Sequence, residues 1–197
     1  IIHGLKDEVE KVTKEELKDK EALTVINDVI IPALNIVGKD YETGKIFLPQ
    51  LIQSAETTKK AFEVVKETFS ANDGEEKGPI IIATVEGDIH DIGKNLVALM
   101  LKNHGFHVID LGKDVPQAKI LETAKENHAE FIALSALMTT TMQRMREIVA
   151  AAKQEGITAK IIIGGAVITQ EYADEIGADG YSKDAADAVK LAKSLME

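Results

Sequence analysis

The two halves of the chain carry different hydrophobic patterns. In roughly the first 70 residues, apolar side chains recur at helical spacing, which predicts helices over 5–18, over 21–37 and from residue 47 onward. Pro32 lies inside the second of these runs, so a kink or a break is expected there. Three or four helices in this length predict a small helical bundle.

The second half alternates short apolar runs with amphipathic ones. The expected strands are 80–85, 107–111, 131–135, 160–163 and a short one near Gly180 and Tyr181. The expected helices are 92–103, 117–127, 140–154, 169–176 and 184–196. Continuous apolar runs are typical of strands that are buried on both faces. The order predicts an α/β fold with a doubly wound parallel sheet, Rossmann-like or flavodoxin-like, whose ligands bind beyond the carboxyl ends of the strands.

A polar segment separates the two halves. The sequence SANDGEEKGP, residues 70–79, is rich in Gly, Asp and Glu and ends in proline just before an apolar run. We therefore expect a helical cap domain over 1–72 and a sheet-containing domain over 73–197. The loose composition of the linker also predicts a hinge over 70–79.

Composition limits the classes of function. With 45% apolar and 28% charged residues, the chain is expected to be soluble, and a net charge of −10 argues against a nucleic-acid partner. No unbroken apolar stretch approaches the length of a membrane span, and no signal peptide is evident, so no membrane association is expected. The absence of cysteine excludes thiolate metal sites and favours a cytoplasmic location. Because the chain begins with isoleucine, we expect it to be a piece of a longer protein.

The segment EGDIHDIGKN, residues 86–95, follows the first predicted strand and so lies at the expected binding edge. A hydrolytic metal site could use Asp88, His90 and Asp91, although no second such cluster follows another predicted strand. In an ordinary turn, Asp88 or Asp91 would cap the next helix and Gly93 would allow close packing. Alternatively, a carboxylate could orient His90 as the one protein ligand of a metal that a large cofactor holds. The residues alone leave these interpretations open.

Two nucleotide-binding motifs fit this segment poorly. In a phosphate-binding loop, four residues separate the glycines and a serine or threonine follows the lysine. Here Gly87 and Gly93 are one residue too far apart, and Asn95 follows Lys94. The dinucleotide pattern G-x-G-x-x-G is also missing from the loop.

Four segments resemble the cobalamin-binding region of cobalamin-dependent methionine synthase and of other corrinoid methyltransferase proteins. The pattern D-x-H-x-x-G over 88–93 is similar to the cobalamin-binding signature of that family. SALMTTT over 135–141 and IGGA over 163–166 resemble the family's later segments in order and spacing, and residues 44–62 resemble the preceding cap. Corrinoid proteins of methanol, methylamine and O-demethylase systems share this plan.

The resemblance implies specific roles. His90 would be the lower axial ligand of cobalt, displacing the dimethylbenzimidazole of the cofactor, which is the base-off, His-on mode. Asp88 would hydrogen-bond His90, and Thr141 would be the third member of this relay, a position often held by serine. The residues that the resemblance implies in cofactor binding are Asp88, His90, Asp91, Ile92, Gly93, Ser135, Leu137, Thr139, Thr141, Gly164, Gly165, Ala166, Tyr181, Ser182, Tyr41 and Leu48.

Within this set, the resemblance assigns contacts to the nucleotide tail and to the corrin. The tail contacts are Ser135, Thr139, Gly164, Gly165, Tyr181 and Ser182. The glycines would leave room for the tail between a strand and a helix. Tyr41 and Leu48 would cover the upper face of the corrin, although both also suit a plain bundle core.

The function implied is that of a methyl carrier. As part of a methionine synthase, the chain would bind methylcobalamin and need modules for folate and homocysteine together with a reactivation partner. It would not be expected to complete a turnover alone. The alternative is a corrinoid shuttle protein of a methanol, methylamine or O-demethylase system, and a third possibility is a corrinoid-based sensor.

Overall fold

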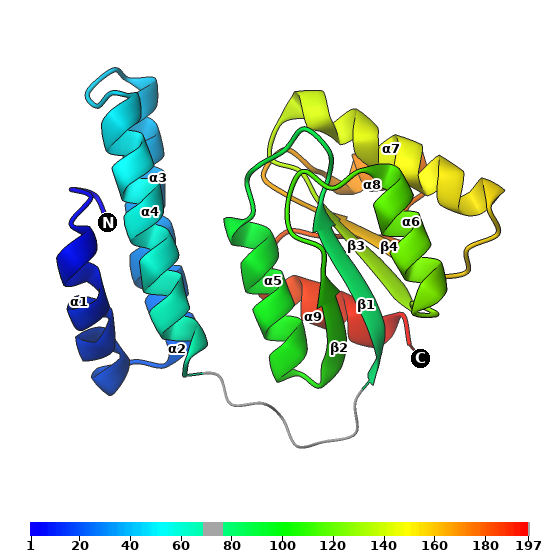
Figure 1. Cartoon of the computed structure of the whole chain (residues 1–197), viewed down its shortest axis with the longest axis horizontal. Helices are drawn as coiled ribbons and strands as arrows, with labels where there is room; N and C mark the ends of the chain where they lie inside the picture. Colours follow the sequence, from blue (N-terminus) through cyan, green and yellow to red (C-terminus); the bar gives the residue numbers. More distant parts are fainter. Residues whose placement is uncertain (69–76, 197) are drawn as a thin grey trace. The chain divides into compact units, whose positions relative to one another are not determined.

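The structure is a computed structural model that describes residues 1–68 and 77–196 (Figure 1). Contacts between its residues group the chain into two compact units. We call the helices before residue 69 the helical unit and the elements from residue 77 onward the α/β unit. The predicted domain boundary at residues 72 and 73, and the expected hinge as far as residue 76, lie outside the described residues. The last three residues of the predicted linker already belong to the first strand, which begins at Lys77.

The helical unit confirms the predicted helices. It consists of α1 (Lys6–Asp19), α2 (Ala22–Val25), the π-helix η1 (Ile26–Ile30), α3 (Ile31–Glu42) and α4 (Leu48–Lys66). Helix α1 packs along α4, and α3 also contacts α4. The buried apolar side chains of this unit include Val9, Val25, Ile26, Ile30, Val37, Ala61, Val64 and Val65.

Pro32 changes the helix without ending it. Just before it, η1 widens into a π-turn in which the Ile31 N–H donates to the Ile26 carbonyl, five residues back. Proline has no N–H to offer the ordinary α-helical ladder, and a π-turn is one way for a helix to absorb such a defect. The helix therefore continues to Glu42, and the predicted end near residue 37 is wrong.

The helical unit contains a segment that the sequence analysis missed. The continuous helix Ala22–Glu42 is long and apolar enough to cross a membrane by length and composition alone, with a mean hydropathy of 1.4 over its best window. Asn27, Asp28 and Asn35 interrupt the apolar run, so a search for unbroken stretches passes over it. Length and composition are weak evidence for a span, because core helices of soluble proteins meet the same test.

The α/β unit has the predicted alternation. Its strands are β1 (Lys77–Thr84), β2 (Phe106–Asp110), β3 (Phe131–Ser135), β4 (Lys160–Gly164) and β5 (Gly180–Ser182). Its helices are α5 (Ile92–Asn103), α6 (Gln117–Glu126), α7 (Thr139–Gln154), α8 (Gln170–Ile176) and α9 (Ala185–Ser194). All strands are parallel in the order β2-β1-β3-β4-β5, the flavodoxin-like arrangement. Helices α5 and α9 cover one face of the sheet, and α6, α7 and α8 cover the other (Figure 1).

The register of the sheet brings distant segments into one row at its carboxyl edge. Thr84 at the end of β1 pairs with Ser135, Ser135 pairs with Gly164, and Gly164 pairs with Ser182. The strands behind this row are almost wholly apolar and buried. Burial on both faces fixes the register, because a slip by one residue would reverse every side chain. The core thus aligns three motif segments that lie far apart in the chain.

Gly165, directly after β4, lies close to the backbone of Ala136, directly after β3, and a substitution can test this close approach. Its φ is +134°, and a Cβ there would lie 1.9 Å from the Ala136 carbonyl oxygen. Gly165→Ala should therefore lower the free energy of unfolding by more than about 2 kcal/mol, measured by urea unfolding of the apo-protein. The control is Gly156→Ala, at φ +67° with no other group within 4 Å, which should cost only about 1 kcal/mol. Equal losses in the two variants would refute a backbone clash at Gly165.

Candidate functional site

The candidate site begins in the loop between β1 and α5. Asp91 holds the N-cap position of α5, but its side chain makes no capping hydrogen bond. Its backbone carbonyl instead accepts from the Asn95 N–H at 2.8 Å. Asp91 therefore marks the start of the helix without the side-chain cap that an ordinary turn of this kind would use.

Asp88 is the centre of the site. It is fully buried, with a relative exposure of 0%. Its Oδ1 accepts the backbone N–H of His90 at 3.0 Å and lies 2.7 Å from Nδ1 of the same residue. Two bonds to one neighbour fix both the backbone and the ring of His90, as an aspartate does when it bonds its own chain two residues on.

The second carboxylate oxygen of Asp88 is held by the connection from β3 to α7. Oδ2 accepts the Leu137 N–H at 2.8 Å, and the Met138 N–H lies 3.4 Å away. The Thr141 hydroxyl lies 2.8 Å from the same oxygen. Threonine therefore makes the bond that the family resemblance implies for this relay position, where serine is common. The backbone donors carry no side-chain signature, so the sequence analysis did not find them.

The pKa of Asp88 reflects both its burial and its hydrogen-bond donors. Burial raises the pKa of the carboxyl group, but the donors from Leu137, His90 and Thr141 outweigh burial and lower it from 3.8 to about 2. At neutral pH Asp88 is therefore an anion that can only accept hydrogen bonds. The proton between the pair then belongs to Nδ1 of His90, and in the neutral ring Nε2 carries the lone pair.

His90 presents that lone pair to the outside of the protein. Its side chain is 46% exposed, and Nε2 forms no hydrogen bond with the part of the chain that the structure describes. In its neutral form, an imidazole that is held in one orientation and has a free ring nitrogen can bind a metal. Over residues 1–68 and 77–196 there is no group of three or more histidine, cysteine, aspartate or glutamate residues that could hold an ion. The geometry thus favours a single protein ligand over the hydrolytic metal site considered from the sequence.

The structure distributes the remaining predicted residues over three places. The row at the carboxyl edge of the sheet contains Ser135, Gly164 and Ser182, and Tyr181 lies half-buried beside them in β5. The adjoining loops and helix ends contain Ile92, Gly93, Leu137, Thr139, Gly165 and Ala166. Tyr41 and Leu48 belong to the helical unit, where they are 43% and 56% exposed. Neither is a buried core residue, contrary to the alternative that the sequence left open for them.

Lys94 is a residue that the sequence analysis singled out only to reject a phosphate loop. Its side chain is 1% exposed, and Nζ lies 2.5 and 2.7 Å from the carboxylate oxygens of Asp110 at the end of β2. A buried ammonium near a helix N-terminus is unfavourable unless a carboxylate compensates for it. The pair therefore ties the first turn of α5 to β2. A lysine next to a loop motif gives no hint of its partner in sequence.

Fold and site together define a class of protein. It has a helical N-terminal unit and a flavodoxin-like domain whose first loop presents one oriented histidine. Comparison with known proteins supplies the family. Two family models described as B12 binding domains match residues 1–66 and 78–190, so the chain belongs to the B12-binding family of corrinoid proteins, and its cofactor is a cobalamin or related corrinoid.

Individual relatives agree along the whole chain. Dimethylamine corrinoid protein 2 of Methanosarcina mazei is 41% identical over 199 residues, covering 100% of this chain and 93% of the relative. A corrinoid protein of Desulfitobacterium hafniense is 36% identical, covering 100% and 94%. The solved monomethylamine corrinoid protein of Methanosarcina barkeri has a TM-score of 0.89 at 33% identity, covering 99% of this chain and 94% of that one. These findings confirm the predicted fold class and cofactor.

The ionised state of Asp88 predicts a pH-dependent contribution to stability. Because its folded-state pKa is lowered, the stabilisation is present above 3.8 and is lost as the pH falls towards about 2. Asp88→Asn should therefore cost about 2 kcal/mol of unfolding free energy at neutral pH, and progressively less across that acid window. Unfolding of both proteins in urea at several pH values measures the difference.

Asp91→Asn is the matched control, since it removes a carboxylate from the same loop that makes no capping bond. Its effect should be small at neutral pH. A cost for Asp88→Asn that stays constant through the acid window would contradict the assigned state of Asp88.

Proposed function

We propose that this chain is a corrinoid protein that binds cobalamin through His90 and carries a methyl group between methyltransferase proteins. The observation that carries the proposal is the pair formed by Asp88 and His90. Asp88 is anchored from two sides, and its Oδ1 holds Nδ1 of His90 at 2.7 Å, which leaves Nε2 exposed for a ligand. No other imidazole in the described residues is held by a buried carboxylate.

The donor set suits a corrinoid. The cofactor would bring its own ring ligands to cobalt, so that the protein would need to add only one ligand, which His90 would supply. When bound, the corrinoid supplies a cobalt that can accept and release a methyl group. His90 would bind the cobalt of the corrinoid, and Asp88, held by Thr141, would keep the imidazole in the orientation that leaves Nε2 free for it.

A glycine three residues after His90 supports the same proposal. Gly93 lies in the first turn of α5, where glycine is unfavourable compared with alanine by about 0.5–1 kcal/mol. A Cβ at Gly93 would meet no other group within 4 Å, so the protein's own packing does not require glycine there. Open space next to His90 suits a flat macrocycle. Gly165 differs, because the backbone of Ala136 alone already requires glycine at that position.

The helical unit contributes an apolar surface to the proposal. Around the connection from α3 to α4, Tyr41, Phe47, Leu48 and Ile52 are 43%, 68%, 56% and 50% exposed. Large apolar side chains exposed together mark a binding surface more often than isolated ones do. We assign Tyr41 and Leu48 to the upper face of the corrin, as the family resemblance implies.

The relatives favour a methylamine or methanol system over a methionine synthase. Those named above are corrinoid proteins, and the names of two of them include dimethylamine or monomethylamine. One chain of a solved methanol:cobalamin methyltransferase complex from Methanosarcina barkeri is 32% identical to this chain, with a TM-score of 0.60. A shuttle protein that serves a methylamine or methanol methyltransferase is therefore better supported than part of a methionine synthase. Folate and homocysteine modules, a reactivation partner, a cytoplasmic location and the absence of membrane or nucleic-acid partners stay predictions.

Isotope labelling tests the proposed ligand. The protein is produced with ¹⁵N-histidine, loaded with unlabelled cobalamin and reduced to the cobalt(II) state. An imidazole bound to cobalt should split each electron paramagnetic resonance line into a doublet, because the ¹⁵N nucleus has spin one-half. A triplet would show that the cofactor's own base is still bound, and it would refute His-on binding.

Substitution then identifies which histidine is bound. His90→Ala should remove the doublet and leave a base-off spectrum or no retained cofactor. His107→Ala is the control, because His107 lies near the amino end of β2, away from the loop. A doublet that persists in His90→Ala would assign the ligand to another histidine.

Gly93→Ala separates the needs of the cofactor from those of the fold. Alanine is the better helix former and would contact nothing within 4 Å, so the apo-protein should gain up to about 1 kcal/mol of stability. Its affinity for cobalamin should fall, because the added methyl group occupies the space proposed for the corrin. Thermal unfolding and spectrophotometric titration measure the two effects. Unchanged affinity would place the corrin elsewhere.

A further inference from the structure

A third loop holds the candidate site, and no motif of the sequence marks it. The chain leaves β2 at Asp110 and reaches α6 at Gln117 through a connection that runs past the end of β1. Thr84, at the end of β1, binds this connection through its backbone. Its N–H donates to the Gly112 carbonyl at 3.0 Å, and its carbonyl accepts the Val115 N–H at 3.1 Å. Val115 also bridges Val85 in parallel pairing. The connection is thus fixed in register beside the loop that carries His90.

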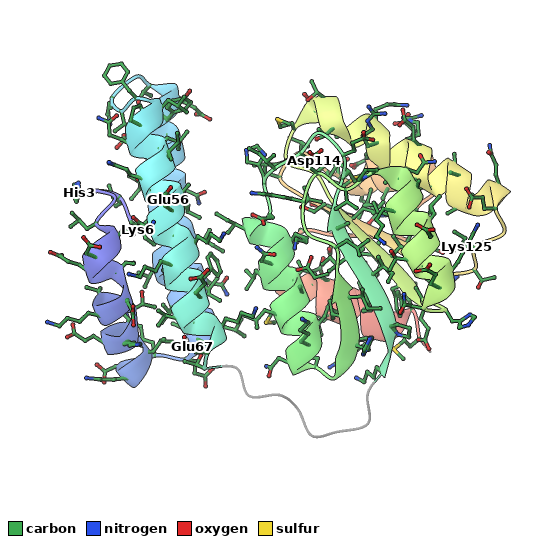
Figure 2. The ribbon with its side chains drawn as sticks, viewed as in Figure 1. His3, Lys6, Glu56, Glu67, Asp114 and Lys125 are labelled. Carbon is green, nitrogen blue, oxygen red and sulfur yellow. The ribbon has the colours of Figure 1, made fainter. Side chains whose placement is uncertain are left out.

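Asp114 joins this connection to the loop at two points. Its backbone N–H donates to the Asp88 carbonyl at 3.0 Å. Its Oδ1 accepts the Gly87 N–H at 2.7 Å. One residue therefore binds the two peptide groups that flank the Gly87–Asp88 peptide unit, at the Gly87 N–H and at the Asp88 carbonyl. Figure 2 labels Asp114 among the loops at the carboxyl end of the sheet.

The backbone of Asp114 is unusual. Its φ is +54°, in the left-handed region that L-residues other than asparagine and aspartate rarely adopt. Gly87, the residue whose N–H it binds, also has a positive φ of +82°. Asp114 is exposed, so that burial of its side chain does not explain the conformation. Non-glycine residues held in this region gather at sites where the surrounding structure needs them.

Asp88 is thereby fixed at both ends. Leu137 and Thr141 hold its carboxylate from the β3 side, whereas Asp114 holds its backbone carbonyl from the β2 side. Because Oδ1 of Asp88 sets both the backbone and the ring of His90, any shift in the backbone of Asp88 moves the imidazole. We infer that Asp114 is a positioning residue that holds the His90 loop in the form able to bind cobalt, an inference that rests on the proposed role of His90.

Two substitutions separate the hydrogen bond from the backbone strain. Asp114→Gly removes the acceptor but suits a positive φ, so the apo-protein should keep its fold and its thermal stability. Asp114→Asn keeps an acceptor oxygen and tolerance of this φ while removing the charge. The inference predicts that glycine impairs histidine coordination and that asparagine restores it.

The readout is the fraction of cobalt(II) that carries the ¹⁵N-histidine doublet at saturating cobalamin. A hydrogen bond of ordinary net strength corresponds to a roughly tenfold change in an equilibrium constant. Asp114→Gly should therefore shift the ratio of imidazole-bound to imidazole-free cobalt about tenfold towards the free form. Asp114→Asn should stay close to the unaltered protein. A role in stability alone would change the unfolding temperature and leave this ratio unmoved.

Each other result overturns the inference in a recognisable way. An unchanged ratio in Asp114→Gly, with the doublet present in the unaltered protein, refutes the role of Asp114 alone. An equal loss in Asp114→Asn shows that charge matters and the acceptor does not, which also refutes it. If the unaltered protein gives no doublet, the proposed function fails together with the inference.

A second variant covers the case in which glycine at 114 perturbs the fold. Asp114→Glu keeps the charge but moves the carboxylate one methylene away from the Gly87 N–H. It should also lose the doublet in part, while circular dichroism of the apo-protein stays unchanged. Full coordination by this variant would overturn the inference.

Discussion

The site depends on one buried anion. Asp88 sits in the interior with no exposure, and an isolated carboxylate in such a place would be protonated. It stays ionised because donors from its own loop and from the β3–α7 connection converge on both its oxygens. That charge decides which nitrogen of His90 carries the proton and which one faces outward. The orientation of the exposed imidazole is thus set by a residue that is itself fully buried.

The parallel sheet brings these hydrogen-bond donors together around Asp88. The two residues that bind the Asp88 carboxylate from the β3 side, Leu137 and Thr141, lie 49 and 53 residues away in the chain. Only the register of β1 against β3, with Thr84 opposite Ser135, brings them to the same edge. Isoleucine-rich strands buried on both faces hold that register, so the hydrophobic core determines the geometry of a polar site at its rim.

In the α/β unit, both backbone conformation and a side-chain ion pair hold the segments around the site in place. Gly87 and Asp114 adopt positive φ values, and Gly165 packs its Cα against the Ala136 carbonyl, so that loops from several strands can lie close to one another. The buried pair of Lys94 and Asp110 ties the first turn of α5 to β2. Since Lys94 follows Gly93 directly, this pair also fixes the helix end where the corrin is proposed to lie.

The sequence by itself determined the alternation of strands and helices and the doubly wound class, because hydrophobic periodicity is a local property. Its resemblance to a known family pointed to Asp88, His90 and Thr141 as candidate site residues. Tertiary structure decided the rest. The backbone N–H of Leu137, the carbonyl that Asp114 binds and the partner of Lys94 have no signature in a list of side chains. The π-turn before Pro32 is likewise absent from the sequence pattern, because a proline is compatible both with the end of a helix and with a widened turn. Contacts between residues far apart in the chain exist only once the sheet has fixed their register.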